Sequence, residues 1–239
     1  MNITPNLIIN GKSSRSITGL LISSLAPISK PPQRTRIETI DGRDGDLVTE
    51  LGFNAYDKPV LIGLTYNYNM DEVIDFFNSS GTVIFSNEPD KIYSFAIYNQ
   101  IDFERLIRFK TATVVFHVQP FKFSVSEKEQ IFDVSSNLNT IRIRNAGNYF
   151  STPTLKITAT GLVDLSLNDT QILSIDFGET SQTIIIDADK MNAYDSAGNL
   201  VNRLVTGNYD NIKLNIGPNT ITTAGNVSRV EVDKYSRWI

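Results

Sequence analysis

Short runs in which apolar and polar side chains alternate dominate this chain and limit what it can fold into. In the clearest run, residues 111–118, the apolar side chains are Ala112, Val114, Phe116 and Val118. Alternation with a period of two predicts strands that bury one face. Residues 103–110 alternate in the same way, so we expect one long strand over 103–118, or two strands with a bend near Lys110 and Thr111. A chain built from such runs is a mainly β protein.

Residues 70–78 form the one segment that argues for a helix. Asn69 is a good N-cap residue, and Glu72 stands at the third helical position, as in a capping box. Val73, Ile74 and Phe77 fall on one side of such a helix, which suits packing against a sheet. Two serines and a glycine at 79–81 end it. We therefore expect a single helix, in the first half of the chain.

Turn residues and a charged stretch divide the chain further. Residues 81–86 and 92–98 predict a hairpin around the turn at 87–90. The strand run then meets Pro120 and gives way to charged residues, so a domain boundary is expected within 119–130. We divide the chain into residues 1–125 and residues 126–239.

After this boundary the expected strands are short and evenly spaced, with no helix between them. Their turns fall at residues 168–169, 195–199 and 217–219. The strands are expected at 140–144, 154–160, 164–167, 171–175, 183–187, 211–216, 219–223 and 227–235. This spacing predicts an antiparallel β-sandwich for the second domain.

Composition excludes much enzymology. The 239 residues are 41% hydrophobic and only 20% charged, which is enough to bury a core. Cys is absent, which removes disulfides, thiolate metal sites and Cys nucleophiles. His117 is the single histidine and is best interpreted as a structural or surface residue, so we expect no catalytic residue and no metal site. No Gly-rich phosphate loop occurs, so no cofactor is expected.

Acidic residues offer two further candidate sites, and both are weak. Residues 41–46 (DGRDGD) look like a calcium loop but lack its ligand spacing, and a tight polar turn with Gly at positive φ explains them. Carboxylates also gather near the second-half strands, as Asp187 with Asp189 and as Asp164, Asp169 and Asp176. Such residues are usually solvated turn residues, and a carboxylate-based hydrolase would need Asp187 and Asp164 to face one cleft.

Basic residues cluster in two places. Lys30, Arg34 and Arg36 lie in a Pro-rich loop, and Arg105, Arg108 and Lys110 lie in the expected long strand. They are either solubilising charge or, if several copies surround a channel, a ring of positive charge facing a polyanion. The net charge of −4 argues against nucleic-acid binding over the whole surface. Residues 26–32 are too Pro-rich for a central strand and are expected to form an extended arm. The candidate arm and interface residues are Leu25, just before this range, and Pro27, Ile28, Pro31 and Pro32 within it.

Targeting signals are not apparent. The longest apolar runs are only a few residues long, so no membrane insertion is expected. The start of the chain lacks the pattern of a secretory signal. We expect the protein to be made in the cytoplasm, and to stay there or leave by a route other than ordinary secretion.

An ordered set of motifs resembles one known family. The motifs are IING at 8–11, PQRTRIETI at 32–40 with DGRDG at 41–45, Tyr56, QIDF at 100–103, TVVFHVQPF at 113–121, NAGNYFSTP at 145–153, IIID at 184–187, GPNTI at 217–221 and RWI at 237–239. Each motif alone is weak, but together they span nearly the full chain in the expected order. The chain resembles the distal tail protein (Dit) of long-tailed, non-contractile phages.

This resemblance implies a structural virion protein of the tail tip or baseplate. Members of the family pair an N-terminal split-barrel (belt) domain carrying one helix with a C-terminal galectin-like antiparallel β-sandwich. Six copies form a ring that joins the tail tube protein to a tail-associated lysin or tail-fibre hub protein and to receptor-binding or baseplate proteins. Phage DNA passes through the opening. For this chain the resemblance implies a homohexamer made in the bacterial host, with candidate channel-lining residues Arg34, Arg36, Arg105, Arg108 and Lys110.

A carbohydrate-binding module is the alternative function. Sugars stack on aromatic side chains, and Tyr149 and Tyr209 are candidates in the second half. Sugar-binding galectins, however, arrange His, Arg and Trp over one sheet. Here the single His precedes the expected sandwich and the single Trp, Trp238, lies at the C-terminal end. We therefore expect the second domain to be a docking scaffold.

Overall fold

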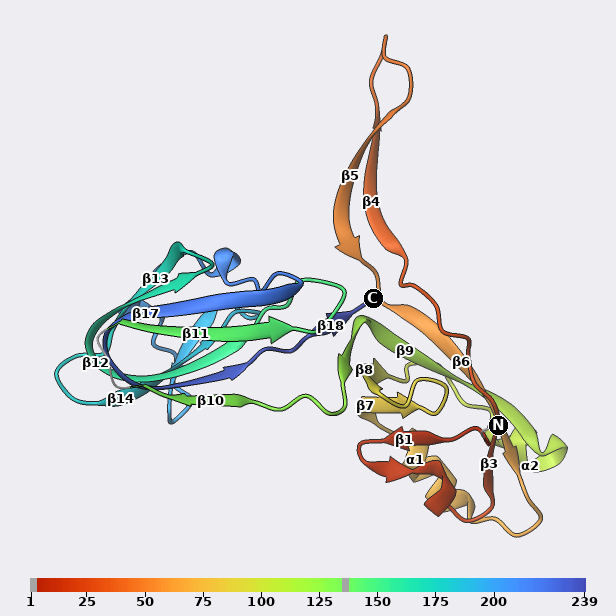
Figure 1. The fold of residues 1–239 in the computed structure, drawn as a ribbon. Helices are drawn as coiled ribbons and strands as arrows, with labels where there is room; N and C mark the ends of the chain where they lie inside the picture. Colours follow the sequence, from red (N-terminus) through yellow and green to blue (C-terminus); the bar gives the residue numbers. More distant parts are fainter. Residues whose placement is uncertain (1–3, 135–137) are drawn as a thin grey trace. The chain divides into compact units, whose positions relative to one another are not determined.

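The computed structural model describes residues 4–134 and 138–239 and divides into two compact units (Figure 1). The first unit is Met1–Val125 with Ile239, and the second is Ser126–Trp238. Each unit has its own hydrophobic core. The architecture is mainly β with antiparallel sheets, so the predicted fold class is confirmed.

The first unit is built on a curled antiparallel sheet. Its strands lie in the order β2-β1-β7-β8-β9-β6-β3. Their bounds are β1 Leu7–Ile9, β2 Lys12–Ser13, β3 Leu20–Ser24, β6 Tyr56–Leu64, β7 Ser80–Phe85, β8 Lys91–Ala96 and β9 Thr111–Ser124, with a 3-10 turn η1 at Ser14–Ser16. The alternation predicted for residues 111–118 is confirmed in β9, where Ala112, Val114, Phe116 and Val118 are buried. The predicted hairpin at 81–98 is confirmed as β7 and β8.

Helix α1, Met70–Phe77, is the predicted helix, with Asn69 as its N-cap. The Asn69 side chain accepts the backbone N–H groups of Asp71 and Glu72. Glu72 does not close a reciprocal capping box: its carboxylate accepts the backbone N–H of Thr18 at 3.1 Å and the Asn69 side-chain amide. Phe76 is buried with Val73 and Phe77, whereas Ile74 is exposed, which corrects the predicted packing face.

Helix α2, Phe103–Phe109, replaces the strand predicted over 103–110, and that prediction is wrong. The Asp102 carboxylate accepts the backbone N–H of Arg105 at 2.7 Å, and Lys110 ends the helix with φ of 59°. The buried residue of α2 is Leu106, which lies three residues after Phe103 and therefore on the same helical face. The alternation concealed an N-cap and a helical spacing.

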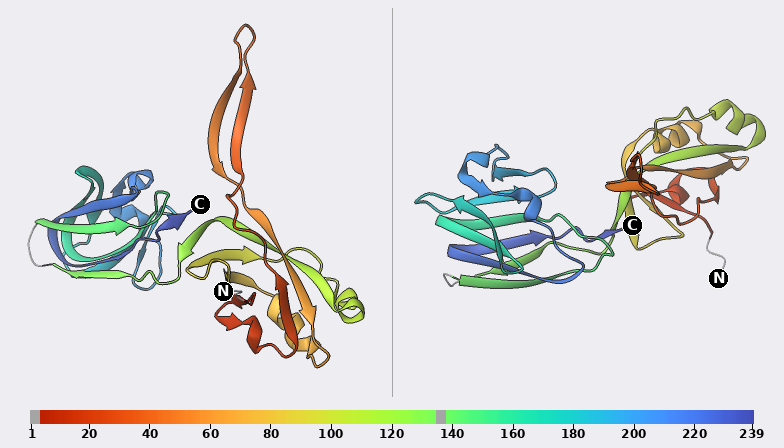
Figure 2. Two further views of the ribbon diagram at one scale, coloured as in Figure 1. Left: turned by 45° about the vertical axis from the view of Figure 1, so that its right-hand side comes forward. Right: turned by 90° about the horizontal axis from the view of Figure 1, so that it is seen from above.

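The second unit is an antiparallel sheet that curls around its own core (Figure 2). Its strands are β10 Gln130–Asp133, β11 Leu138–Asn145, β12 Thr154–Leu167, β13 Thr170–Asp176, β14 Gln182–Asp187, β15 Asn192–Asp195, β16 Val205–Gly207 and β17 Gly217–Asp233, with 3-10 turns η2 at Asn202–Leu204 and η3 at Tyr209–Asn211. The short strand β18, Arg237–Trp238, follows β17 and is not part of this sheet. The prediction of a strand at 211–216 is wrong. After η3 this segment forms only an isolated β-bridge, between Leu214 and Ser151.

Two long strands belong to both halves of this sheet. The first part of β12 pairs with β14 and the last part of β17, whereas its second part pairs with β13 and the first part of β17. The register shifts between Thr160 and Asp164, where the strands bend from one half to the other. The separate strands predicted at 154–160 and 164–167 are thus one bent strand, and those at 219–223 and 227–235 are another.

The bend in β17 requires a glycine at position 225. Gly225 has φ of +128°, and a Cβ there would lie 2.5 Å from the backbone oxygen of Leu162. We expect Gly225→Ala to lower the free energy of unfolding of the second unit by about 2–3 kcal/mol. The matched control is Gly161→Ala, at φ of +70° with open space around the added Cβ, which should cost about 1 kcal/mol. Equal shifts of the two variants in urea unfolding would contradict the steric explanation.

Candidate functional site

A long hairpin is the most exposed element of the first unit. Strands β4, Gln33–Thr39, and β5, Asp46–Phe53, form a two-stranded sheet of their own, which stands out from the larger sheet of this unit (Figure 1). Gly42 and Gly45 at its end have φ of 80° and 79°, so the predicted tight turn is confirmed. Sequence reasoning missed the two strands, although turn residues flanked by β-branched residues were a usable signal.

Large apolar side chains are exposed on both faces of this hairpin. Ile37 pairs with Val48 on one face, and the two side chains are 61% and 54% exposed. Leu47 pairs with Glu38 on the other face and is exposed as well. An isolated two-stranded hairpin is only marginally stable in water, and apolar side chains that stay in solvent do not stabilise it. The hairpin therefore presents an unusually apolar exposed surface, of the kind found at binding sites.

The base of the hairpin is fastened to the first unit. The Asn54 N–H donates to the Pro32 oxygen at 2.8 Å, which closes the two ends of the hairpin. The Phe53 ring packs edge-on against the ring of Phe121 in β9, with centroids 6.0 Å apart, and the Lys30 ammonium lies 5.8 Å from the Phe53 ring. The base of the hairpin is thus held in place at one end of β9.

The Pro-rich segment before β4 leads into this hairpin. Asn87 donates its side-chain amide to the Ala26 oxygen, and Lys58 donates its ammonium to the Pro27 oxygen, both at 3.0 Å. Of the candidate arm residues, Pro31 is buried and Leu25 is half-buried, whereas Pro27, Ile28 and Pro32 are exposed. The segment is anchored through its carbonyl oxygens.

The Lys58 side chain that bonds to the Pro27 oxygen is buried among aromatic rings. Its side chain is almost fully buried, and its ammonium lies 5.4–5.8 Å from the ring centroids of Phe85, Tyr93 and Tyr56. Burial lowers the pKa of Lys58, because removal from water disfavours the charged form. Cation–π contacts and the hydrogen bond to Pro27 offset part of that cost.

Glu88 supplies the negative charge for this buried region. It accepts the Lys122 ammonium at 2.5 Å and the hydroxyl of Tyr93. Burial, followed by the hydrogen bond to Glu88, raises the pKa of Tyr93 well above its usual value. These two lysines, the carboxylate and the tyrosine form a buried polar cluster, which we define as Lys58, Glu88, Tyr93 and Lys122.

The basic residues named from the sequence fall into two separate groups. Arg34 and Arg36 lie in β4, where Arg34 donates to the Leu51 oxygen at 3.0 Å and Arg36 pairs with Glu38 at 2.5 Å. Arg105 and Arg108 lie on the exposed side of α2, and the Lys110 ammonium lies 4.4 Å from the Tyr68 ring centroid. The structure does not bring the two groups together: the base of the hairpin packs at Phe121 and α2 ends just before Thr111, about 30 Å away along β9.

Residues considered for catalysis are engaged in local pairs. His117 contacts Asp57 at 2.8 Å, Asp187 contacts Lys190 at 2.8 Å, and Asp189 contacts Arg237 at 2.6 Å. Asp164 lies past the bend of β12, in the other half of the sheet from Asp187, and accepts a hydrogen bond from Gln171. Within residues 4–134 and 138–239, no group of three His, Cys, Asp or Glu residues could hold a metal ion. No helix in those ranges is long and apolar enough to cross a membrane.

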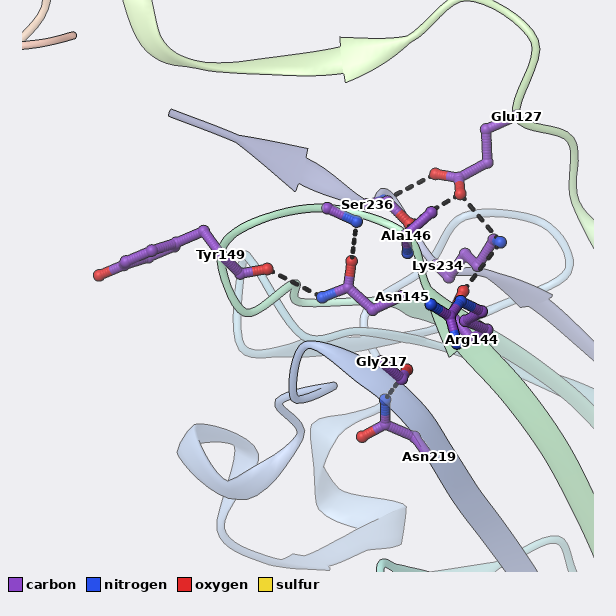
Figure 3. Close-up of polar contacts among 10 residues, drawn as sticks. Glu127, Arg144, Asn145, Ala146, Tyr149, Gly217, Asn219, Lys234 and Ser236 are labelled. Atoms are coloured by element: carbon purple, nitrogen blue, oxygen red, sulfur yellow. Dashed lines mark hydrogen bonds and ion pairs between the residues drawn. The ribbon is translucent and has the colours of Figure 1, made fainter.

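Glu127 organises a polar network at the start of the second unit (Figure 3). Its carboxylate accepts the Ser236 backbone N–H and hydroxyl, both at 2.7 Å, and pairs with Lys234 at 3.0 Å. Lys234 also donates to the Arg144 oxygen, and the Ser236 hydroxyl accepts the Ala146 N–H. The first and last segments of this unit are therefore tied to each other and to the loop after β11.

The aromatic candidates for sugar stacking are held by the protein itself. Tyr149 packs on Phe150 with ring centroids 4.5 Å apart, and the Lys213 ammonium lies 5.4 Å from the Phe150 ring. Tyr209 is half-buried against the core of the second unit, and this burial raises its pKa. Tyr149 and Tyr209 therefore both take part in packing within the second unit.

Comparison with known proteins identifies the fold. No protein-family model matches the chain, and no curated protein matches its sequence. A solved structure of the Dit protein of phage SPP1, described as a paradigm of the hub adsorption apparatus in phages that infect Gram-positive bacteria, matches with a TM-score of 0.70 and 15% identity over 98% of this chain and 100% of that one. A chain of the phage P2 baseplate in its activated conformation with Ca matches with a TM-score of 0.50 and 9% identity over 96% of this chain and 97% of that one. The chain has a Dit-like phage tail hub fold.

Proposed function

We propose, from a fold shared over its full length with a phage tail hub protein, that this chain is a structural protein of a phage tail tip. Six copies form a ring through the first unit, and the protein has no catalytic activity. The observation that carries this proposal is the match to the SPP1 Dit protein, which covers both units in one chain. The motifs found in the sequence support the same family.

The exposed hairpin gives the ring a physical basis. A cyclic ring needs two different surface patches per subunit, because each copy contacts its neighbours head to tail. The hairpin, with Ile37 and Val48 on one face and Leu47 on the other, has the exposed apolar surface that one such patch requires. Assembly would remove these side chains from water.

The ring would join the parts of the tail. In this proposal one side meets the tail tube protein, and the other meets a tail-associated lysin or tail-fibre hub protein. The second unit serves as a scaffold for receptor-binding or baseplate proteins. Phage DNA passes through the opening, where sixfold symmetry multiplies any basic residue that faces it. The candidates are Arg34 and Arg36 on the hairpin and Arg105, Arg108 and Lys110 at α2.

Ring formation can be tested through the hairpin. We expect the purified protein to have about six times the 26.7 kDa mass of the chain in light scattering, and to show rings with a central hole in negative stain. Replacing Ile37 and Val48 together by Lys should weaken assembly by about tenfold or more per side chain, because each buried aliphatic group contributes about 2 kcal/mol.

Leu162→Lys is the matched control for this test. Leu162 is an equally exposed aliphatic residue, 64% exposed, but it lies in the second unit. This variant should keep the ring. A wild-type protein that stays monomeric at high concentration would count against the proposed function itself. Loss of the ring in the control as well would show that added charge, rather than the hairpin, disrupts assembly.

A further inference from the structure

Helix α2 exposes a surface with the composition of an interface. Only Leu106 of this helix is buried, while Phe109 is 62% exposed and Ile107 is 44% exposed. Arg105 and Arg108 lie beside them, and a shallow depression of 220 Å³ is lined by Asp102, Glu104, Arg105, Arg108 and Phe109. Exposed aromatic and arginine side chains together are typical of the centre of protein interfaces. We call Asp102, Glu104, Arg105, Ile107, Arg108 and Phe109 the α2 surface.

The end of the β4–β5 hairpin has the complementary composition. Residues 40–47 contain three acidic residues, Asp41, Asp44 and Asp46, and one basic residue, Arg43. Ile40 and Leu47 flank them and are 45% and 38% exposed. We call residues 40–47 the hairpin tip. The tip is acidic with an apolar border, whereas the α2 surface offers two arginines beside apolar side chains and two carboxylates.

These two surfaces cannot meet within one copy. The hairpin is anchored at Phe121, near the end of β9, and α2 precedes the first residue of that strand. The two views of the first unit agree that the hairpin extends away from α2 (Figures 1 and 2). Complementary patches at opposite ends of one unit make a head-to-tail contact between copies, which closes into a ring when the rotation allows it.

We propose that the hairpin tip of one copy docks on the α2 surface of the next copy. This inference rests on the proposed ring and names the receiving surface for the hairpin. The aspartates of the tip pair with Arg105 and Arg108, and Arg43 pairs with the carboxylates of Asp102 and Glu104. Ile40 and Leu47 cover Ile107 and Phe109. This gives Arg105 and Arg108 a role in the subunit contact instead of the channel lining.

The mixed chemistry of the α2 surface favours a protein over DNA as its occupant. Phosphate contacts gain nothing from an exposed Phe109 and Ile107, and Asp102 and Glu104 would repel a phosphate backbone. Glu104 also pairs with Arg108 at 3.3 Å, which neutralises part of the local charge. A partner with both signs of charge and apolar side chains fits all of these groups.

Charge reversal tests the contact in the full chain. The tip variant carries Asp41→Lys and Asp44→Lys, and the α2 variant carries Arg105→Glu and Arg108→Glu. We expect each variant alone to raise the concentration needed for half-assembly by at least about tenfold, because close charge pairs across interfaces are strongly coupled. A one-to-one mixture of the two variants should form rings again, because every tip then finds an α2 surface of opposite charge. Light scattering and negative stain read out both results.

The controls separate this inference from the proposed ring. Glu179→Lys and Arg203→Glu reverse exposed charges in the second unit and should leave assembly unchanged. Circular dichroism must show that the tip and α2 variants are folded. Intact rings in both variants, or two variants that fail to assemble when mixed, would overturn the docking contact while the ring stands. An α2 variant that keeps its ring but loses binding of short duplex DNA would return these arginines to the channel. A monomeric wild type would overturn both proposals.

Discussion

Replacing Glu88 by Leu is expected to lower the free energy of unfolding of the first unit by about 3–5 kcal/mol. The change removes the carboxylate that accepts the Lys122 ammonium and the Tyr93 hydroxyl, while Lys58 stays buried nearby. A buried charge that loses its partner retains the full cost of its removal from water. Differential scanning calorimetry should show this loss in the transition of the first unit, because the second unit has a core of its own.

A second substitution tests whether the charge is the cause. Lys122→Met in the Glu88→Leu background removes the unpaired ammonium and leaves an apolar pair of similar volume, which is often close to neutral in stability. We expect this double variant to recover at least half of the loss. An equal loss in both variants would show that Glu88 acts through packing, and an unchanged transition in Glu88→Leu would show that the cluster is not coupled to folding.

The buried polar cluster links the stability of the first unit to its candidate assembly surface. Lys58 donates a hydrogen bond to the backbone oxygen of Pro27, seven residues before Arg34. From Pro27 the chain runs through Pro31 and Pro32 into β4, the first strand of the hairpin. The hairpin has few contacts beyond its base, so the direction in which it leaves the unit depends on the base being fixed. A loosened cluster should therefore weaken assembly even where Ile37 and Val48 are intact.

Patterns local in sequence predicted much of the fold. Helix α1 was predictable because Asn69 and its apolar face lie within one short segment, and β9 because its buried residues alternate without interruption. Helix α2 was missed because seven residues fit both periods, and only the Asp102 cap and the buried Leu106 distinguish them. The prediction divided each of the bent strands β12 and β17 in two, because Gly161 and Gly225 resemble turn residues when only the sequence is considered.

The candidate site was less predictable because its determinants are distant in sequence. Lys122 and Glu88 are 34 residues apart, and Lys58 and Pro27 are 31 residues apart. Nothing in a single sequence shows that these side chains share a buried region. The candidate basic residues form two groups in the sequence, but only the strand β9 shows that these groups lie at opposite ends of the first unit. The hairpin was hidden because β4 has a single apolar residue, Ile37, and the apolar residues of β5 do not alternate with a period of two.

Gly147→Ala is expected to have the largest effect on the second unit. A Cβ at position 147 would lie 2.0 Å from the backbone oxygen of Arg237 and 2.7 Å from its backbone nitrogen. That oxygen also accepts the N–H groups of Asn148 and Tyr149, so it cannot move without breaking both bonds. We expect a loss of about 3 kcal/mol, at the upper end for overpacking, and a fall of roughly 10–20 °C in the Tm of this unit.

The same variant should open the network around Glu127. The loop after β11 can make room only by moving away from Ser236, whose hydroxyl links Ala146 to the Glu127 carboxylate. Amide hydrogen exchange should therefore accelerate at Ser236 and Ala146 well before the core strands of this unit exchange. Gly198→Ala is the control, because an added Cβ there meets open space and only the positive φ is strained. An equal fall in the free energy of unfolding in both variants would contradict this explanation. It would show that the close approach of Arg237 to this loop does not hold the end of the chain in place.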